Sequence, residues 1–427
     1  MRGLAAAVRR GAMGLVVLAM ACEAGRPSAP PRTTDRAGTP ITAHELGTRL
    51  PGMPTPRAGG WRYVYVGTQP LELSDVVATG PENVWAIGWH KGTVNLLTYD
   101  GRGWRSVASP LPPIRSNEDV LLGASGPRDV WLLHTGANGT MVFRWDGQKW
   151  RAGVGLAFPV LSVKVVSAND VWAVGGRLIW HWDGQRWDGS PLPATANHDV
   201  PVSDPQVLTG RQEPMTDDSP LPATASALDV SGYSVWAVGF RENGPGIAGE
   251  QLTQPAAMRW TGRSWRTTKT PIYTYPTTPP EAGASLDKVV AVDEDHAWAL
   301  GKYSWNHGEG GWEPKEPSPY LLHWDGRAWT ERKSAALRPY CCDHLIGDGA
   351  GGVVIGGDTL GDTWHVTSSG VTTRIPRMRA SPDTYASIRA LAHIPGTRTI
   401  MAIGTLKIAD QDHPAIAIRE PAPPGED

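Results

Sequence analysis

The chain has few of the residues and motifs that identify a specific chemistry. Among its 427 residues are only three cysteines and three phenylalanines, and 40 basic against 42 acidic residues leave a net charge of −2. Phosphate binding needs a concentrated basic face, so this balance predicts no nucleic-acid partner. The Ser, His and Asp residues follow no nucleophile motif and no zinc-ligand spacing, so the sequence predicts no catalytic residue and identifies no metal site.

Long hydrophobic runs are also missing, and a short one lies at the N-terminus. Gly11–Met20 follows Arg2, Arg9 and Arg10 and is too short to span a bilayer, which is typical of an export signal. The run ends in Ala-Met-Ala-Cys, which either resembles a bacterial lipoprotein signal, with lipidation at Cys22, or is an ordinary signal-peptidase site. We expect residues 1–22 to act as a signal peptide that directs export and to leave either a cell-surface lipoprotein, held only by a lipid anchor at Cys22, or a secreted protein.

The segments that flank the central part of the chain carry no apolar periodicity. Residues 23–58 are rich in Pro, Arg, Thr and Gly and predict a disordered linker, and residues 421–427 predict a disordered tail. One domain is therefore expected over residues 59–420, and we expect it to be monomeric.

Tryptophan, glycine and proline are abundant, with 20, 50 and 38 residues, and two repeated motifs account for much of the tryptophan. The first, here called the VWAVG motif, begins near residues 84, 130, 171, 235 and 297, with degenerate copies at 353–356 and 401–404. The second, the WDGxxW motif, follows at 99–104, 145–150, 182–187, 260–265 and 324–329, with a weak copy from Trp364. A period of this kind is typical of a repeat architecture.

Each repeat predicts four short strands. Asp-Gly between apolar runs is a hairpin signal, because glycine accepts the positive φ that the turn needs, and VWAVG is a short strand stopped by glycine. Such a unit cannot bury both faces alone, whereas radial stacking buries them with Trp rings between neighbouring sheets. The seven copies of the first motif predict an all-β, seven-bladed β-propeller of four-stranded antiparallel blades.

The last repeat lacks its fourth strand, and the start of the domain supplies a candidate. Gly60-Trp61-Arg62 resembles Gly103-Trp104-Arg105, which belongs to a predicted fourth strand. We predict that Trp61–Val66 pairs beside Ala415–Arg419 and closes the ring, which removes two exposed sheet edges.

The two motifs resemble those of kelch-type propellers, and more closely the Trp-rich repeats of secreted bacterial proteins grouped loosely with kelch and sialidase-type repeats. The resemblance covers residues 60–420. It implies the propeller fold but no activity, because propellers host enzymes, lectins and scaffolds alike. The Ser-x-Asp-x-Gly-x-Thr-Trp box of sialidases is not reproduced, since its serine is missing.

Long connections are predicted on one face of the propeller only. They are residues 188–226, 241–255, 267–284, 302–319 and 331–342, and variable loops on a rigid scaffold commonly carry binding sites. Aromatic and histidine residues outside the motifs gather there and suit a glycan or a peptide, unless they only fold the loops onto themselves. These candidates are Trp89, His90, Tyr273, Tyr275, Tyr303, Trp305, His307 and Trp312.

A second set of candidates precedes the first strands of the repeats. Carboxylates there would ring the mouth of the central channel, where they could hold Ca²⁺ or a basic group, unless they only start the strands. They are Asp75, Asp119, Asp229, Asp287 and Asp343, with Ser162 and Arg389 at comparable places. Apart from Ca²⁺, no cofactor is predicted. Cys341 and Cys342 either form a vicinal disulfide or remain free thiols.

Two functions fit these observations. The first is a non-enzymatic binding or scaffold propeller that recognises an extracellular polysaccharide or a cell-surface protein through its long-loop face. The alternative is an extracytoplasmic hydrolase or lyase acting on carbohydrate, which would need paired carboxylates about 5–10 Å apart at the channel mouth. Two carboxylates beside an Arg or His in a deep pocket would favour the enzyme.

Overall fold

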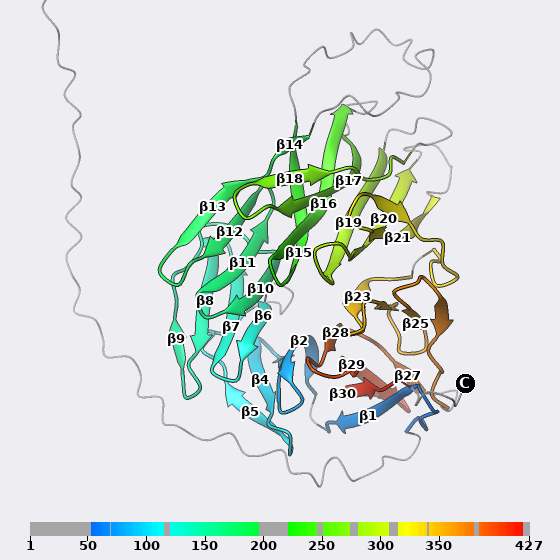
Figure 1. The fold of residues 1–427 in the computed structure, drawn as a ribbon. Helices are drawn as coiled ribbons and strands as arrows, with labels where there is room; N and C mark the ends of the chain where they lie inside the picture. Colours follow the sequence, from blue (N-terminus) through cyan, green and yellow to red (C-terminus); the bar gives the residue numbers. More distant parts are fainter. Residues whose placement is uncertain are drawn as a thin grey trace, which may run out of the picture. The chain divides into compact units, whose positions relative to one another are not determined.

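The computed structural model describes residues 53–68, 70–114, 120–195, 221–245, 251–273, 281–306, 315–339, 341–379 and 384–421. The chain divides into residues 1–37 and residues 38–427, and all described residues belong to the second unit. Every regular element within these ranges is a β-strand, which confirms the all-β class. Figure 1 shows the sheets arranged around a common centre, which is the architecture of a β-propeller.

The strands form six hydrogen-bonded sheets, five of them with four or five strands and one with nine. Three four-stranded sheets come first along the chain. The first contains β2 (Glu72–Gly80), β3 (Asn83–His90), β4 (Thr93–Tyr99) and β5 (Trp104–Ala108). The second contains β6 (Val120–Gly126), β7 (Asp129–Gly136), β8 (Gly139–Trp145) and β9 (Trp150–Ala152). The third contains β10 (Ser162–Ser167), β11 (Asp170–Gly175), β12 (Leu178–Trp182) and β13 (Trp187–Pro191).

The nine-stranded sheet contains β14 (Ala194–Thr195), β15 (Leu221–Ser231), β16 (Ser234–Pro245), β17 (Gln251–Trp260), β18 (Trp265–Thr268), β19 (Glu281–Ala291), β20 (Ala297–Asn306), β21 (Lys315–Trp324) and β22 (Trp329–Glu331). A four-stranded sheet follows, with β23 (His344–Gly347), β24 (Val353–Gly356), β25 (Thr363–Val366) and β26 (Thr372–Arg374). The last sheet combines β27 (Thr384–Ala386), β28 (Ala390–His393), β29 (Ile400–Ile408) and β30 (Gln411–Arg419) with β1 (Trp61–Val66).

The described residues form six separate sheets, whereas seven blades were predicted. The difference arises in the nine-stranded sheet. A parallel bridge between Thr253 and Gly283 joins β17 to β19, so that two consecutive up-and-down meanders become one hydrogen-bonded sheet. The strands involved are also longer than expected. Much of the predicted loops 241–255 and 302–319 belongs to the hairpins β16–β17 and β20–β21. Pairing across a hairpin satisfies backbone N–H and C=O groups that a long loop would leave to water.

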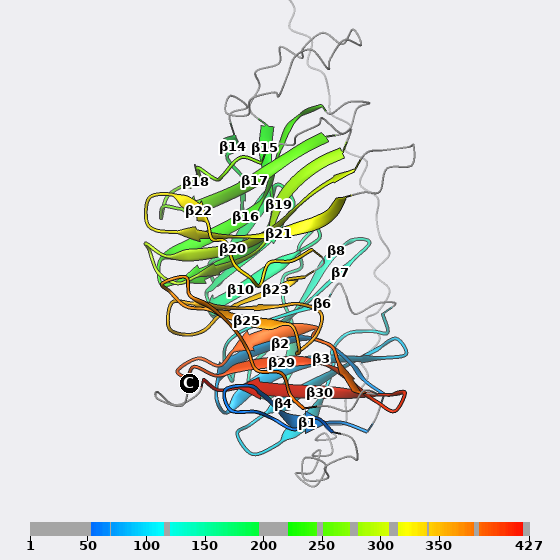
Figure 2. The same cartoon turned by 90° about the vertical axis from the view of Figure 1, so that its right-hand side faces the viewer.

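The predicted closure by the N-terminal strand is confirmed. β1 lies antiparallel beside β30, with Trp61 opposite Arg419 and Val66 opposite Ala415 (Figure 2). The chain is ordered against the propeller somewhat before residue 59, because the backbones of Thr55 and Arg379 exchange hydrogen bonds of 2.6 and 2.8 Å. The predicted linker 23–58 therefore includes a short segment that belongs to the folded unit.

The two repeated motifs meet between neighbouring units. The Trp236 ring from one VWAVG motif lies edge-on to Trp324 and Trp329 of the next WDGxxW motif, at centroid distances of 5.2 and 5.1 Å. Trp85, Trp131 and Trp172 make the same contacts with the pairs 145/150, 182/187 and 260/265. This arrangement explains the spacing of the motifs, because the two Trp of each WDGxxW face each other across a hairpin and accept the third ring.

The Asp of the WDGxxW motif holds the turn. Asp146 Oδ1 accepts hydrogen bonds from the backbone N–H groups of Lys149 and Gln148, both at 2.9 Å, and these bonds lower the pKa of Asp146 to about 2. Gly147 has a φ of 97°, a conformation that side chains disfavour, so the turn needs glycine at this place.

Candidate functional site

The described aromatic candidates are largely packing residues. Trp89 and His90 are the last residues of β3 rather than part of a loop, and Trp89 packs against the buried cluster between the first two sheets. Tyr273 stacks on Tyr303 and Tyr320 at 5.5 and 4.4 Å and donates a 2.9 Å hydrogen bond to Glu331. Burial of the Tyr273 hydroxyl, followed by the nearby Tyr320 and Glu331, raises its pKa well above the usual range.

The remaining aromatic candidates are not placed. Tyr275, His307 and Trp312 lie outside the described residues, and for Trp305 only the backbone is described, as a residue of β20. Their role in a binding site stays a prediction.

The candidate carboxylates do not form one ring, and two of them link neighbouring units. Asp75 Oδ2 accepts the backbone N–H of Leu122 at 2.8 Å, which joins β2 to β6. Asp229 Oδ2 accepts the backbone N–H of Ala291 at 2.9 Å and joins β15 to β19 in the same manner. The first strand of a unit has backbone N–H groups that face the axis and have no strand beside them. A carboxylate from the preceding unit supplies the acceptor that such an N–H needs.

The other carboxylates have separate surroundings. Asp287 lies at a bulge of β19 and accepts a 2.9 Å hydrogen bond from Ser285 Oγ. Asp343 forms an ion pair with Lys302, and Asp119 lies outside the described residues. Because Asp75 and Asp229 are engaged with backbone and Asp343 with a lysine, no shared cation geometry results. Among the described residues, no group of three or more His, Cys, Asp or Glu is arranged to hold a metal ion.

Asp75 instead belongs to a cavity of about 430 Å³ that several units enclose together. The lining residues come from β19 and from the beginnings of β2, β6, β23 and β28. Because these are the first strands of their units, the cavity lies on the axis of the propeller. It lies at the end of the strands where the long hairpins begin. The lining residues are Glu72, Ser74, Asp75, Val120, Leu121, Lys288, His344, Leu345, Arg389, Ala390 and Leu391.

Charges of both signs face this cavity. Burial raises the pKa of Asp75 to about 6, against the opposing effect of its two backbone hydrogen bonds and of Lys288. Burial, with the charge of Lys288, lowers the pKa of His344 to about 4, so that this imidazole is neutral at pH 7. Arg389 lies 3.7 Å from Glu72. Sequence reasoning missed Glu72 and Lys288, although Lys288 directly follows one of the predicted aspartates.

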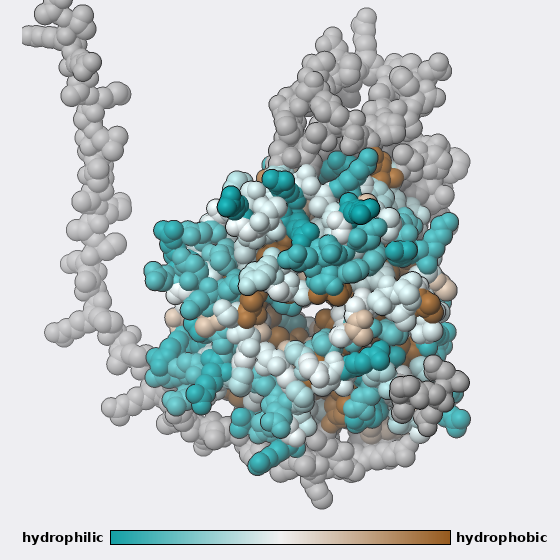
Figure 3. Space-filling model, in the orientation of Figure 1, coloured by the Kyte–Doolittle hydropathy of each residue, from teal (hydrophilic) through white to brown (hydrophobic). Residues whose placement is uncertain are grey.

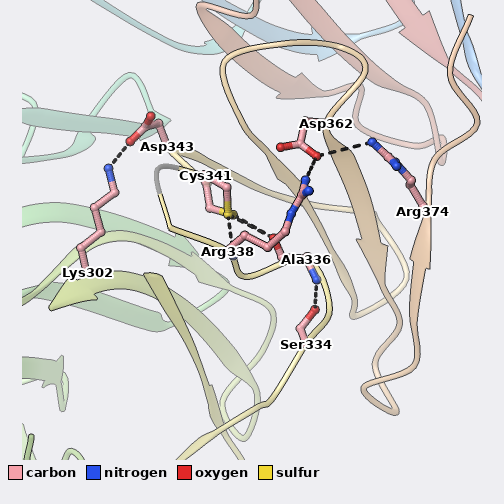
Figure 4. The surroundings of a disulfide bond; sticks show 9 residues. Lys302, Ser334, Ala336, Arg338, Cys341, Asp343, Asp362 and Arg374 are labelled. Carbon is pink, nitrogen blue, oxygen red and sulfur yellow. Dashed lines mark hydrogen bonds and ion pairs between the residues drawn. A yellow bond between two sulfur atoms is a disulfide. The ribbon is translucent and has the colours of Figure 1, made fainter. Parts of the chain in front are cut away.

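A disulfide supports one wall of the cavity. Cys341 and Cys342 are bonded to each other and buried, and Asp343 and His344 follow directly (Figure 4). Cys342 has a φ of 78°, which is uncommon for a residue other than glycine, so the disulfide occurs at a sharply turned point of the chain. The turn orients Asp343 toward Lys302 while His344 begins β23 and lines the cavity.

Asp343 also shares a hydrogen bond with Asp358, which makes a carboxyl pair beside Lys302. Burial acts to raise the pKa of Asp343, but the hydrogen bond and charge of Lys302 outweigh it and lower that pKa. Burial and the neighbouring Asp343 raise the pKa of Asp358. When the pair holds one proton, these opposite shifts place it on Asp358.

Comparisons with known proteins agree with the fold. No protein-family model matches the chain, and no curated protein matches it. The structure is similar to hydrazine synthase of Kuenenia stuttgartiensis, with a TM-score of 0.51, 9% identity, and coverage of 83% of this chain and 97% of that chain. It is also similar to the WD40 repeats of RRP9, with a TM-score of 0.47, 11% identity, and coverage of 86% of this chain and 98% of the other.

A third similar structure is a catalytically inactive virginiamycin B lyase from Staphylococcus aureus with quinupristin, with a TM-score of 0.47, 13% identity, and coverage of 83% and 98%. At 9% identity, the likeness to hydrazine synthase is one of fold and says nothing of activity. The resemblance to kelch-type repeats stays a prediction. The described part of the chain contains no helix that is long and apolar enough to cross a membrane.

Proposed function

We propose that this protein is a binding propeller that takes up a peptide segment of a partner protein at the axial cavity. The observation that carries the proposal is the cavity of about 430 Å³ that five propeller units line and into which three of them direct charged side chains of both signs. A β-propeller suits a binding or scaffold role, because its rigid ring positions residues from distant parts of the sequence around one axis.

The lining favours a peptide over a polysaccharide in this cavity. Sugar rings are held largely by stacking on aromatic faces, and among the lining residues only His344 has an aromatic ring. Glu72 and Arg389 offer a carboxylate and a guanidinium, which complement the charged side chains and the amide groups of a peptide. Ser74 adds a hydroxyl whose oxygen is buried without a partner among the described residues.

The carbohydrate-active enzyme is the second candidate, because the axial cavity brings the carboxylates of Glu72 and Asp75 together with Arg389 and His344. It is less well supported than peptide binding, since Glu72 is paired with Arg389 and Asp75 accepts two backbone hydrogen bonds. Two-carboxylate glycoside hydrolysis needs carboxyl groups about 5–10 Å apart with room for a sugar or a water between them. Asp343 and Asp358 are hydrogen bonded to each other, which is too close for that arrangement, and neither lines the axial cavity.

We propose further that the nine-stranded sheet is functionally two blades, which makes the propeller seven-bladed. Support comes from the buried hydrophobic clusters of the described residues: seven of the eight lie between two consecutive units of the ring, including one between β15–β18 and β19–β22. The single parallel bridge between Thr253 and Gly283 is a small contact by comparison. Export by residues 1–22, with a lipid anchor at Cys22 or secretion, is part of the same proposal.

A peptide-display selection on the purified mature protein tests the proposed function. We expect selected peptides to lose about tenfold or more in affinity to a Lys288→Met variant, because the partner carboxylate would lose its counter-charge. A Lys149→Met variant in an exposed turn is the matched control and should bind as the parent does. Peptides that bind both variants equally would overturn the axial site, and a selection that yields no peptide would overturn the ligand class.

A further inference from the structure

One turn departs from a pattern that four other repeats share. In each of those repeats, the turn residue two positions before the VWAVG motif lies over the glycine of the WDGxxW turn in the same repeat. The covering residues are Glu82, Arg128, Asn169 and Asp295. A Cβ built on that glycine would meet the covering side chain at 2.6 to 2.9 Å. The covered glycines are Gly101, Gly147, Gly184 and Gly326.

The repeat formed by β15–β18 lacks this cover. Tyr233 occupies the covering position, yet its side chain is 92% exposed, and a Cβ on the corresponding Gly262 would meet nothing within 4 Å. A large aromatic ring at the tip of a turn has no packing reason to stand in water, so its exposure points to a role in contact with something else.

Beside the uncovered turn lies a second cavity, of about 610 Å³, between the sheet β10–β13 and the strands β15–β18. It shares no lining residue with the axial cavity and lies at the opposite ends of the strands, where the turn between β15 and β16 is found. The lining residues are Asp170, Trp172, His181, Val230, Gly232, Tyr233, Val235, Arg259, Trp260, Thr261, Gly262 and Glu294.

The polar groups of this cavity are held in place by neighbours. His181 stacks on Trp172 at 4.2 Å, and its Nε2 shares a 2.8 Å hydrogen bond with Asp170. Arg259 lies over the Trp236 ring at 5.7 Å, which orients its guanidinium. Glu294 is exposed at the rim and has no ion-pair partner among the described residues. Donors and acceptors fixed in this manner lose little entropy when a ligand binds.

We infer that this cavity binds a neutral pyranose unit of a glycan. The rings of Tyr233 and Trp260 offer aromatic faces for the C–H groups of a sugar ring. The hydroxyl groups of the sugar would find planar hydrogen-bond donors and acceptors in Arg259, His181 and Glu294. The volume falls within the range of about 300–1,000 Å³ that is usual for small-molecule sites. The inference does not rest on the proposed peptide site.

An array of neutral and acidic oligosaccharides, probed with the full mature protein, tests this inference, and calorimetry with the best array member quantifies it. We expect a neutral oligosaccharide to bind. A Tyr233→Ala variant should lose about tenfold or more in affinity, whereas Tyr233→Phe should keep it, since stacking needs the ring and not the hydroxyl. Because Tyr233 is exposed, the thermal melt of both variants should match that of the parent.

Two controls separate the outcomes. Glu82→Ala changes the same turn position in another repeat and should leave glycan affinity unchanged. Lys288→Met should also leave glycan affinity unchanged, because Lys288 lines only the axial cavity. A failure of the proposed peptide site can therefore be told apart from a failure of the glycan site. The inference is overturned if no neutral oligosaccharide binds, or if Tyr233→Ala binds as well as the parent.

Discussion

At the residue scale, one side-chain type serves two purposes in this molecule. Trp236 is fully buried and contacts two further tryptophans of the next unit, so its burial stabilises the ring of sheets. Trp260 belongs to the WDGxxW motif, is only partly buried and lines the 610 Å³ cavity. A tryptophan in either motif therefore indicates packing, and only the exposure of each ring separates a packing residue from a contact residue.

The same scale includes a carboxyl group whose protonation depends on folding. Asp75 accepts two backbone hydrogen bonds, but burial dominates and raises its pKa from 3.8 to about 6. An acid whose pKa is higher in the folded state binds its proton more tightly there. Its contribution to the free energy of unfolding is therefore greatest at low pH and is lost as pH rises from about 4 to about 6.

An Asp75→Asn variant tests this pH dependence. The parent should be the more stable of the two at pH 4, and its advantage should shrink by about 2 kcal/mol by pH 6.5, because asparagine does not titrate. Urea unfolding of both proteins across this range measures the difference. His344 titrates with the opposite sign but is common to both proteins, so it cancels. A difference that stays constant from pH 4 to 6.5 would show that burial does not shift the Asp75 pKa.

At the element scale, β1 is the strand on which closure depends. It pairs with β30 over its whole length, and the Trp61 indole N–H donates a 2.8 Å hydrogen bond to Thr363 Oγ1 of β25, in the neighbouring sheet. The first residues of the folded unit thus tie its last sheet to the one before it. Without β1, the outer edge of β30 would have unpaired backbone groups.

Deletion of residues 59–67 should therefore open the ring. We expect a broader thermal transition at a lower temperature, because units that no longer stack on both sides unfold less cooperatively. Differential scanning calorimetry of the deletion variant and the parent measures this. Deletion of residues 421–427, at the other end of the unit, is the control and should leave the transition unchanged. A parent-like transition in the first variant would contradict closure by β1.

At the scale of the whole molecule, anchoring depends on a residue outside the described ranges. If Cys22 is lipidated, a Cys22→Ser variant should move from the membrane fraction to the medium, because a lipid chain is the only membrane attachment that the sequence predicts. Fractionation and immunoblotting of cells that express either form measure the distribution. A Ser28→Ala variant, a few residues beyond the predicted lipidation site, controls for the effect of a substitution in this segment and should fractionate as the parent does. Equal release of the parent and Cys22→Ser would leave simple secretion as the mode of export.

The all-β class and the pairing of Trp61–Val66 with Ala415–Arg419 could be predicted from local patterns in the chain. These features depend on local patterns, namely strand propensity, glycine at positive φ and a recurring Trp spacing, which act between residues close in sequence or in equivalent repeats. Turn residues such as Asp146 were predictable for the same reason.

Which candidate residues meet at a site depends on how the units pack around the axis. Lys288, His344 and Arg389 are far apart in the sequence and converge because the ring places the first strands of several units around one axis. Likewise, Tyr233 occupies the same turn position as the covering residues of the other repeats. Only the structure shows that its ring is exposed and that Gly262 is left uncovered. Repeats that are equivalent in pattern differ in which neighbour each side chain contacts, and this difference arises from packing between units.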